Sequence, residues 1–146
     1  MTQKVLFVCI HNSARSQMAE AFVNRFCEGQ ITAQSAGLEP GKLNPLVVEA
    51  MNELGFDISK NRTKSVDSFL RSGELFDLVV TVCDETSAER CPVFPGRVQR
   101  MHWGFPDPSS FHGTREERLE MTRQVRDQIR QRVEAWCETI CPCPPA

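Results

Sequence analysis

The sequence predicts an α/β domain in which four parallel strands form a sheet with helices on both faces, a three-layer arrangement. Short apolar runs alternate with longer helical patterns along the chain, and this alternation is typical of a parallel sheet with helical crossovers. The chain has 146 residues, enough for one domain with its own core. We therefore expect a single domain over residues 1–140, followed by a Cys- and Pro-rich tail over residues 141–146.

Four short apolar runs are the candidate strands. The first three are residues 5–8, 31–36 and 78–82, and a weaker run follows at 98–101. Continuous apolar runs of this kind are typical of parallel strands that are buried on both faces. A turn signal such as Pro40-Gly41 separates the second run from the helical pattern that follows it.

Helical patterns lie between and after these runs, at residues 15–27, 45–54, 65–72 and 114–137. The last begins at Thr114 with Glu117 three residues later, which is the arrangement of a capping box. In an open parallel sheet, ligands bind outside the carboxyl ends of the strands. Cys9 and Cys83, which follow the first and third runs, are therefore expected at this same edge.

The overall composition excludes several classes of protein. The formal net charge is −2, so the chain has no basic surface of the kind that binds nucleic acid. It contains no apolar run of membrane-spanning length and no signal-peptide pattern, which indicates a cytoplasmic protein. In that setting its 7 cysteines indicate redox catalysis or metal binding rather than structural bridges.

A cysteine and an arginine with five residues between them follow the first apolar run directly. Cys9 and Arg15 thus flank a sharp turn from a strand into a helix, which leaves backbone N–H groups unpaired. These groups and the helix dipole favour a bound oxyanion and the thiolate form of Cys9. Arg15 adds a planar fork of donors for two anion oxygens. The spacing predicts a cysteine nucleophile inside an oxyanion-binding loop.

We expect the substrate to be bound by the residues of this loop: Ile10, His11, Asn12, Ser13, Ala14, Arg15 and Ser16. Asn12 tolerates the left-handed backbone that a loop of this kind needs. Ser16 either donates a hydrogen bond to the thiolate or caps the following helix. His11 either tunes the bound anion or points to solvent, and we expect the second.

An Asp-Pro pair, Asp107-Pro108, lies in the loop at residues 103–113. An acid held over the oxyanion would protonate a leaving oxygen, as general acid catalysis requires. The alternative is an ordinary turn, because aspartate and proline are both common in turns.

The loop at residues 9–16, together with Asp107-Pro108 far downstream, resembles the catalytic loops of the low-molecular-weight protein tyrosine phosphatases. It is equally similar to those of the arsenate reductases that share their fold. The resemblance runs over nearly the whole chain. It implies the fold of these phosphatases, a monomer, Asp107 as general acid, and a loop that phosphate or sulfate can also occupy.

Two further cysteines, Cys83 and Cys91, distinguish between the two chemistries, and seven residues separate them. Their placement strongly resembles the thioredoxin-coupled arsenate reductases. The resemblance implies that Cys9 attacks arsenate, that Cys83 then attacks Cys9, and that Cys91 finally attacks Cys83. Arsenite is released, and thioredoxin reduces the last disulfide without any cofactor or metal; glutaredoxin or a low-molecular-weight thiol is the alternative donor. Such a relay predicts that residues 83–91 reorganise on oxidation.

Two alternatives remain open. A phosphatase of the same fold would use the loop and Asp107 equally well, but it has no need of Cys83 and Cys91. A noncatalytic thiol-rich module would instead bind metal or arsenite through the last three cysteines: Cys137, Cys141 and Cys143. We expect those three to be a passive tail, and Cys27, near the end of a helix, to be structural.

Overall fold

The computed structural model describes residues 3–83 and 89–140. In chain order the elements are β1 (Gln3–Cys9), α1 (Arg15–Phe26), β2 (Ile31–Gly37), α2 (Pro45–Asn52), α3 (Val66–Ser72), β3 (Leu78–Thr81), β4 (Gln99–His102), the short 3₁₀ helix η1 (Pro108–Ser110) and α5 (Arg115–Ile140). The four predicted strands and four predicted helices are confirmed, with boundaries that shift by a few residues. Within the described residues, no helix is long and apolar enough to cross a membrane.

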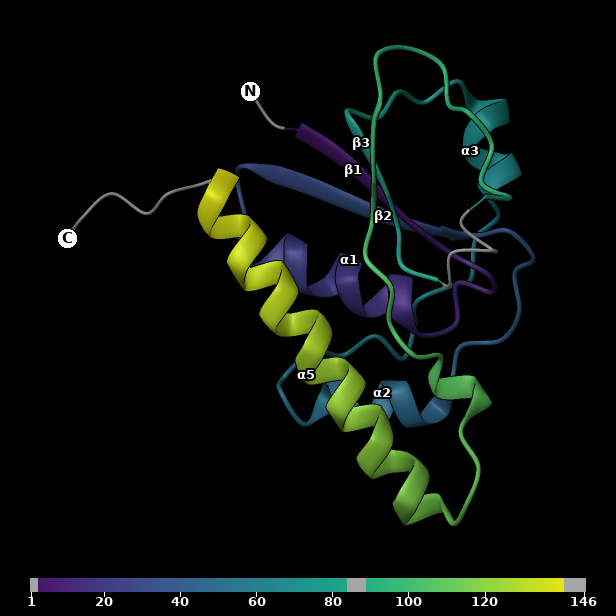
Figure 1. Ribbon diagram of the computed structural model, residues 1–146, viewed down its shortest axis with the longest axis vertical. Helices are drawn as coiled ribbons and strands as arrows, with labels where there is room; N and C mark the ends of the chain where they lie inside the picture. The colour runs from purple at the N-terminus through teal and green to yellow at the C-terminus, as the bar shows by residue number, and fades with distance from the viewer. Residues whose placement is uncertain (1–2, 84–88, 141–146) are drawn as a thin grey trace, which may run out of the picture.

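The four strands form one parallel sheet in the order β2-β1-β3-β4 (Figure 1). β1 is central and pairs with β2 from Gln3↔Ile31 to Cys9↔Gly37, and with β3 from Val5↔Leu78 to Val8↔Thr81. The predicted fold class is thus confirmed. β1 begins two residues before the predicted run because this ladder with β2 starts at Gln3.

Successive side chains of β1 enter two separate cores, because strand side chains alternate between the faces of a sheet. Val5 and Phe7 belong to the larger core, which includes residues of α1, α2 and α5. Leu6 and Val8 belong to the smaller core, which includes Phe69 of α3. In Figure 1, α1, α2 and α5 accordingly lie on one side of the strands and α3 on the other. The three layers that the alternating pattern predicts are present.

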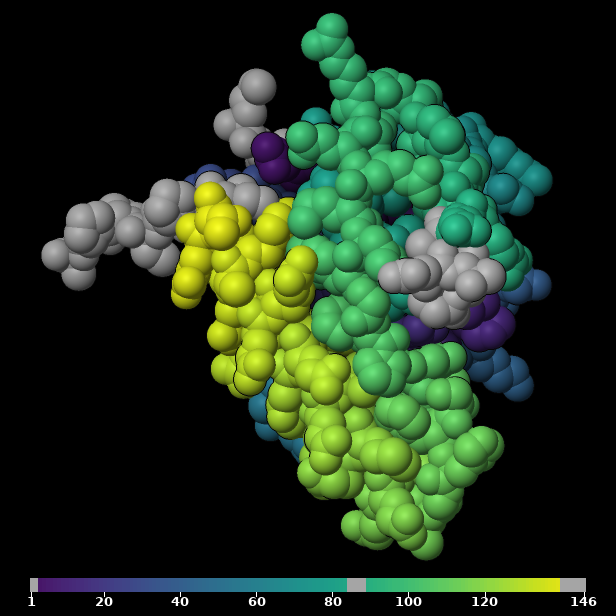
Figure 2. All heavy atoms as spheres, viewed as in Figure 1, coloured from purple at the N-terminus to yellow at the C-terminus, as the bar shows by residue number. Residues whose placement is uncertain are grey.

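The long helix α5 covers much of the larger core. Its Ile129 and Val133 are fully buried, and its Trp136 lies edge-on to Trp103 with ring centroids 5.4 Å apart. In the space-filling view, α5 and the segment that leads through β4 to η1 hide almost all of β1 (Figure 2). Trp103 belongs to this larger core and Phe105 and Phe111 pack against it, so the loop at residues 103–113, here called the acid loop, lies on the same side of the sheet as α5.

A disulfide joins Cys27, just after α1, to Cys137 in α5, with Cα atoms 5.8 Å apart. Cys27 was expected to be structural, and its place in this bond agrees. The expectation of redox catalysis or metal binding rather than structural bridges is wrong for this pair of cysteines, and so is the expectation that Cys137 belongs to a passive tail. Cys137 is the last residue of the predicted helix, and α5 continues three residues beyond it, so Cys137 is a buried helical residue rather than part of a tail. Cys141 and Cys143 lie outside the described residues.

Candidate active site

The predicted oxyanion loop is the connection between β1 and α1. β1 ends at Cys9 and α1 begins at Arg15, so the chain turns within five residues at the carboxyl edge of the sheet. The Cys9 side chain is buried, and Asn12 has a φ of 55°, in the left-handed region. The predicted strand-to-helix turn and the left-handed Asn12 are confirmed.

The neighbouring segment at residues 38–44 donates backbone hydrogen bonds to carbonyl groups on the outer side of the loop. The amides of Leu38 and Gly41 donate to the carbonyl oxygens of Cys9 and His11, at 3.0 Å in both cases. The amide of Asn44 donates in the same way to Ser13 O, also at 3.0 Å. Because its carbonyl groups are bound on the outside, the loop can turn N–H groups inward, toward the sulfur and any bound oxyanion.

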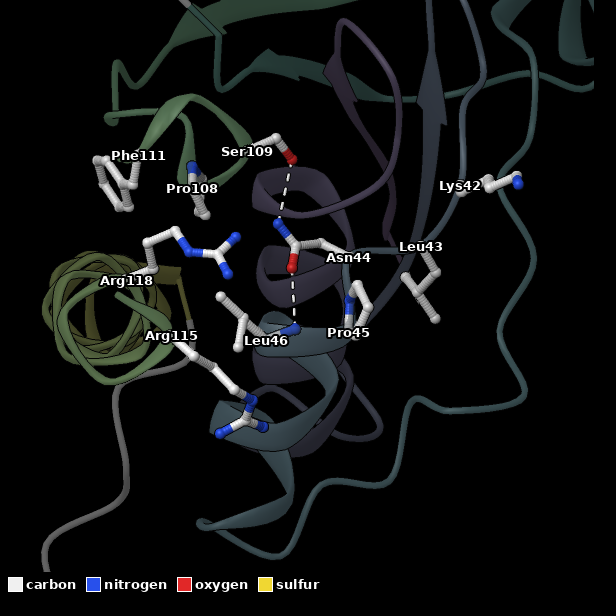
Figure 3. Close-up of a pocket in the computed structure, with 10 residues that line it drawn as sticks. All are labelled: Lys42, Leu43, Asn44, Pro45, Leu46, Pro108, Ser109, Phe111, Arg115 and Arg118. Carbon is white, nitrogen blue, oxygen red and sulfur yellow. Dashed lines mark hydrogen bonds between the residues drawn. The ribbon is translucent and has the colours of Figure 1, made fainter. Parts of the chain in front are cut away.

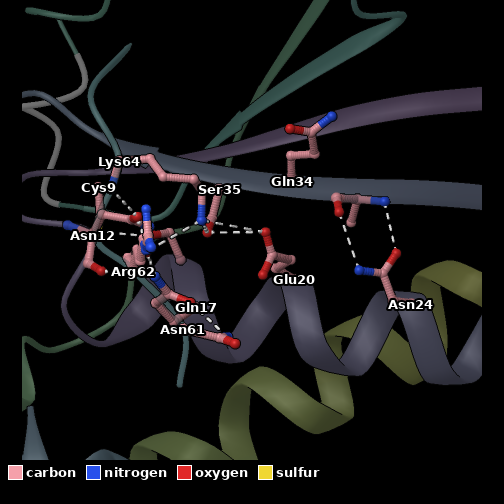
Figure 4. A network of polar contacts seen from close by, with 12 residues as sticks. Cys9, Asn12, Gln17, Glu20, Asn24, Gln34, Ser35, Asn61, Arg62 and Lys64 are labelled. Carbon is pink, nitrogen blue, oxygen red and sulfur yellow. Dashed lines mark hydrogen bonds and ion pairs between the residues drawn. The ribbon is translucent and has the colours of Figure 1, made fainter. Parts of the chain in front are cut away.

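Asn12 is the centre of a buried polar network behind the loop (Figure 4). Its amide nitrogen donates to Ser16 Oγ at 2.7 Å. Its Oδ1 accepts from Lys64 N at 2.8 Å and from Gln17 Nε2 at 3.1 Å. Gln17 in turn donates to Arg62 O at 2.9 Å. Both the nitrogen and the oxygen of the Asn12 side-chain amide are therefore hydrogen-bonded, and these bonds fix the left-handed turn.

The sulfur of Cys9 lies 2.8 Å from Ser16 Oγ and 3.1 Å from the backbone N of Asn12. The side-chain amide of Asn12 donates to the same Ser16 Oγ, so this hydroxyl bridges Asn12 and the sulfur. Of the two alternatives for Ser16, the structure shows the contact with Cys9, and α1 has no side-chain cap. The sulfur thus has two polar neighbours, the Ser16 hydroxyl and the Asn12 backbone N–H, and the N–H donates to it.

Arg15 and Asp107 meet above this loop. The Arg15 side chain is buried; its Nη1 donates to Phe105 O at 3.2 Å, and its Nη2 lies 3.7 Å from Asp107 Oδ2. The other carboxylate oxygen of Asp107 accepts from Ser109 N at 3.0 Å and caps η1. Although they are 92 positions apart in the chain, the two residues lie together, as a general acid over an oxyanion loop requires.

His11 points away from the loop. It is exposed, and its Nδ1 lies 2.8 Å from the carbonyl oxygen of Glu39. The expectation that it faces outward rather than the anion agrees with this contact. Of the other loop residues, Ile10 is partly buried, and the following five are buried: Asn12, Ser13, Ala14, Arg15 and Ser16.

Gly37 shapes the loop, although nothing in the sequence analysis singled it out. It ends β2 opposite Cys9, and a Cβ built on it would lie 2.8 Å from Asn12 N, His11 C and Ile10 O. Contacts that close with backbone atoms cannot be relieved by moving a flexible side chain. A glycine directly after an apolar run, facing the strand that carries the cysteine, is the signal that could have identified it.

The two remaining predicted cysteines lie on opposite sides of the sheet. Cys83 is two residues past the end of β3 and belongs to the larger core, as Cys9 does. Cys91 belongs to the smaller core, and Arg100 Nη2 donates to its carbonyl oxygen at 3.3 Å. Burial raises the pKa of the Cys91 thiol, and the nearby Arg100 opposes that rise. Residues 84–88 between the two cysteines lie outside the described residues.

An ion pair lies on the far side of the Asn12 network. The Nζ of Lys64 is 3.8 Å from Glu20 Oε1 and 3.5 Å from Ser35 Oγ. Burial raises the pKa of the Glu20 carboxyl, and the Lys64 charge opposes this. In the described part of the chain, no three His, Cys, Asp or Glu side chains are grouped to hold a metal ion.

Comparison with known proteins agrees with this geometry. The family model described as low molecular weight phosphotyrosine protein phosphatase matches residues 4–141. The chain therefore belongs to this family, as the resemblance of its loops predicted.

Within the family, the chain is similar to proteins named arsenate reductase. It is 42% identical to that of Shouchella clausii strain KSM-K16 over 140 residues, which is 95% of this chain and 99% of that protein. It is 41% identical to that of Bacillus subtilis strain 168, with the same coverage.

Solved structures give the same result. An arsenate reductase in the oxidized state matches with a TM-score of 0.77 at 32% identity and covers 95% of this chain and 99% of its own. The arsenate reductase of Archaeoglobus fulgidus has a TM-score of 0.70 at 33% identity, with 91% and 98% covered. A thioredoxin-dependent arsenate reductase of Corynebacterium glutamicum has a TM-score of 0.70 at 25% identity, with 98% and 63% covered.

Proposed function

We propose that this protein reduces arsenate to arsenite through a relay of three cysteines, with thioredoxin as the electron donor. The observation that supports it most is the Cys9 sulfur, which contacts the Ser16 hydroxyl and the Asn12 backbone N–H in a loop where Arg15 meets Asp107. The similar proteins named arsenate reductase, and the one called thioredoxin-dependent, support the substrate and the donor.

The first step is nucleophilic attack. The loop amides and the Arg15 guanidinium bind the oxyanion, and the thiolate of Cys9 attacks arsenic. Asp107 gives a proton to the oxygen that departs as water, and a sulfur–arsenic bond remains. The oxidation state of arsenic is still +5 at this stage, so the electrons must come from the next thiol.

The second and third steps are thiol–disulfide exchange. The thiolate of Cys83 attacks the sulfur of Cys9, and the electron pair of the sulfur–arsenic bond goes to arsenic, which leaves as arsenite. Cys91 then attacks the sulfur of Cys83 and frees Cys9 as a thiolate. The product is a Cys83–Cys91 disulfide, which the dithiol of thioredoxin reduces.

Cys9 and Cys83 share one core while Cys91 belongs to the other, so the relay requires the segment between them to move. In this proposal, residues 83–91 carry oxidising equivalents from the buried loop toward the surface. We further propose a cytoplasmic monomer that needs no metal or cofactor of its own, and a loop that also accepts phosphate or sulfate.

A phosphatase is the second candidate, because the nucleophile, the anion loop and the acid are common to both reactions. The residues after Asp107-Pro108 weigh against it. Ser109 and Ser110 stand where family phosphatases often carry aromatic residues that flank a phosphotyrosine ring, and the chain has no tyrosine.

Arsenate-dependent NADPH oxidation, coupled through thioredoxin and thioredoxin reductase, separates the two. We expect turnover by the wild type and its loss in both Cys83→Ser and Cys91→Ser. If the wild type gives no turnover, while aryl phosphate hydrolysis survives both substitutions, the protein is a phosphatase.

A further inference from the structure

Asn44 is bonded to three parts of the structure at once. It is the N-cap of α2, where its Oδ1 accepts from Leu46 N at 2.9 Å and from Val47 N at 3.4 Å. Since these backbone N–H groups need an acceptor, the amide oxygen must face the helix, and Nδ2 must face away from it. The helix therefore sets the direction in which the remaining polar group of the side chain, the Nδ2 donor, points.

That donor group meets the acid loop. Asn44 Nδ2 donates to Ser109 Oγ at 3.1 Å, as Figure 3 shows. Ser109 in turn donates its backbone N–H to Asp107 Oδ1, which leaves Asp107 Oδ2 directed toward Arg15. The bond from Asn44 thus acts on the residue that holds the carboxylate.

The backbone of the same residue contacts the oxyanion loop, because Asn44 N donates to Ser13 O at 3.0 Å. Asn44 is therefore bonded directly to both loops of the proposed reaction, although it touches neither the sulfur nor the carboxylate. A shift of Asn44 would move one loop relative to the other.

An open hollow lies beside this bridge. It has a volume of about 410 Å³ and lies between the start of α2, the acid loop and the start of α5. Leu46, Pro108 and Arg118 are among the residues that line it (Figure 3). Asn44 and Ser109 both line this hollow, so the bond between them joins the start of α2 to the acid loop at the edge of the space.

We propose that Asn44 is a positioning residue that sets the distance between the general acid Asp107 and the oxyanion loop. The inference rests on the proposed function, whose attack and protonation steps it refines. A misplaced acid slows protonation of the leaving oxygen, but it leaves anion binding by the loop amides and Arg15 unchanged.

The test uses Asn44→Ser, Ser109→Ala and the double variant. Serine is as good an N-cap as asparagine but is too short to reach Ser109, so α2 keeps its cap and only the bridge is lost. Ser109→Ala removes the bridge from the other end and keeps the backbone bond to Asp107. Asp107→Asn gives the rate without an acid. The maximal rate and half-saturating arsenate concentration are measured in single turnovers of the reduced protein.

We expect each single variant to lose about ten-fold in maximal rate, part of the 10²–10⁴ that a positioned acid contributes. The half-saturating concentration and the melting temperature should stay unchanged, and the double variant should be no slower than the singles. Unchanged rates, or losses that multiply in the double variant, would overturn the proposal.

A second readout separates this proposal from a failure of the proposed function and from a merely structural role. Phenyl phosphate needs a proton on its leaving oxygen, whereas 2,4-dinitrophenyl phosphate does not. Asn44→Ser should slow hydrolysis of the first about ten-fold and of the second hardly at all. An equal loss on both would overturn the proposal. This comparison remains valid even if the wild type does not reduce arsenate.

Discussion

At the scale of single residues, small side chains and their hydrogen bonds fix the conformation of the oxyanion loop. Asn12 is hydrogen-bonded through both the nitrogen and the oxygen of its side-chain amide, Ser16 lies between Asn12 and the sulfur, and Gly37 has no room for a Cβ beside the loop backbone. Preorganised donors of this kind stabilise an oxyanion without rearranging during the reaction. A substitution that displaces this loop should therefore lower the catalytic activity more than it lowers the free energy of unfolding.

Gly37→Ala is the most direct test of that statement. Its Cβ would lie 2.8 Å from three backbone atoms of the loop, so the loop must move. We expect arsenate or phosphate binding to weaken at least ten-fold in calorimetric titration.

Gly41→Ala is the matched control. The atoms nearest to a Cβ on Gly41 are those of the His11 side chain, at 3.4 Å or more, so this substitution should leave binding unchanged. Equal affinity of Gly37→Ala and the wild type would contradict the view of a rigid loop.

Arg100 should set how readily Cys91 reacts. Burial raises the pKa of the Cys91 thiol and Arg100 partly offsets that rise, so removing Arg100 should raise the pKa further. A higher pKa means less thiolate at a given pH. In Arg100→Gln, the midpoint of the pH profile for Cys91 alkylation should therefore move to higher pH.

Mass spectrometry of the Cys91 peptide measures that profile after timed exposure to iodoacetamide. Arg97→Gln removes a neighbouring arginine and should leave the midpoint in place. A midpoint that is the same in Arg100→Gln and the wild type would show that Arg100 has no such effect.

At the scale of elements, the sequence indicated the strands, the helices and the carboxyl edge where the site lies, because apolar runs and caps act locally. It also identified Cys9, Arg15 and Asp107 as candidates. It missed the Cys27–Cys137 disulfide, since these residues are 110 positions apart and meet only where α1 lies against α5. It missed Gly37 and Asn44 for the same reason: their importance comes from contacts with residues distant in the chain.

The disulfide should stabilise the pairing of α1 with α5. Closing a chain segment of this length restricts the unfolded state, and the typical gain is about 2–4 kcal/mol. We expect Cys27→Ser/Cys137→Ser to lose an amount in that range in urea unfolding. A reductant should destabilise the oxidised wild type similarly and leave the double variant unaffected. Equal stability of the variant and the oxidised wild type would contradict this.

The segment at residues 83–91 should change between redox states, because its two cysteines lie in different cores in the described structure. We expect amide hydrogen exchange in this segment to differ between the reduced protein and the Cys83–Cys91 oxidised protein. Exchange in α3, which packs in the smaller core, provides a comparison. Identical exchange of the segment in both states would contradict a moving relay.

At the scale of the whole molecule, the three layers bring residues from distant parts of the chain to one edge of the sheet. Cys9 ends β1, Cys83 follows β3, and Asp107 arrives on the loop after β4. The alternating pattern predicted the parallel sheet, but it could not give the strand order or the approach of Arg15 to Asp107. Hydrophobic periodicity reports which residues are buried, and not which elements lie next to each other.

The central claim is that electrons pass from Cys91 through Cys83 to arsenic bound at Cys9. Its most direct test is to add arsenate once to fully reduced protein without thioredoxin, quench, and map the disulfides under non-reducing conditions. We predict a Cys83–Cys91 disulfide in the wild type and a trapped Cys9–Cys83 disulfide in Cys91→Ser, each with one arsenite released. If no disulfide forms and no arsenite appears, the relay does not operate in this protein.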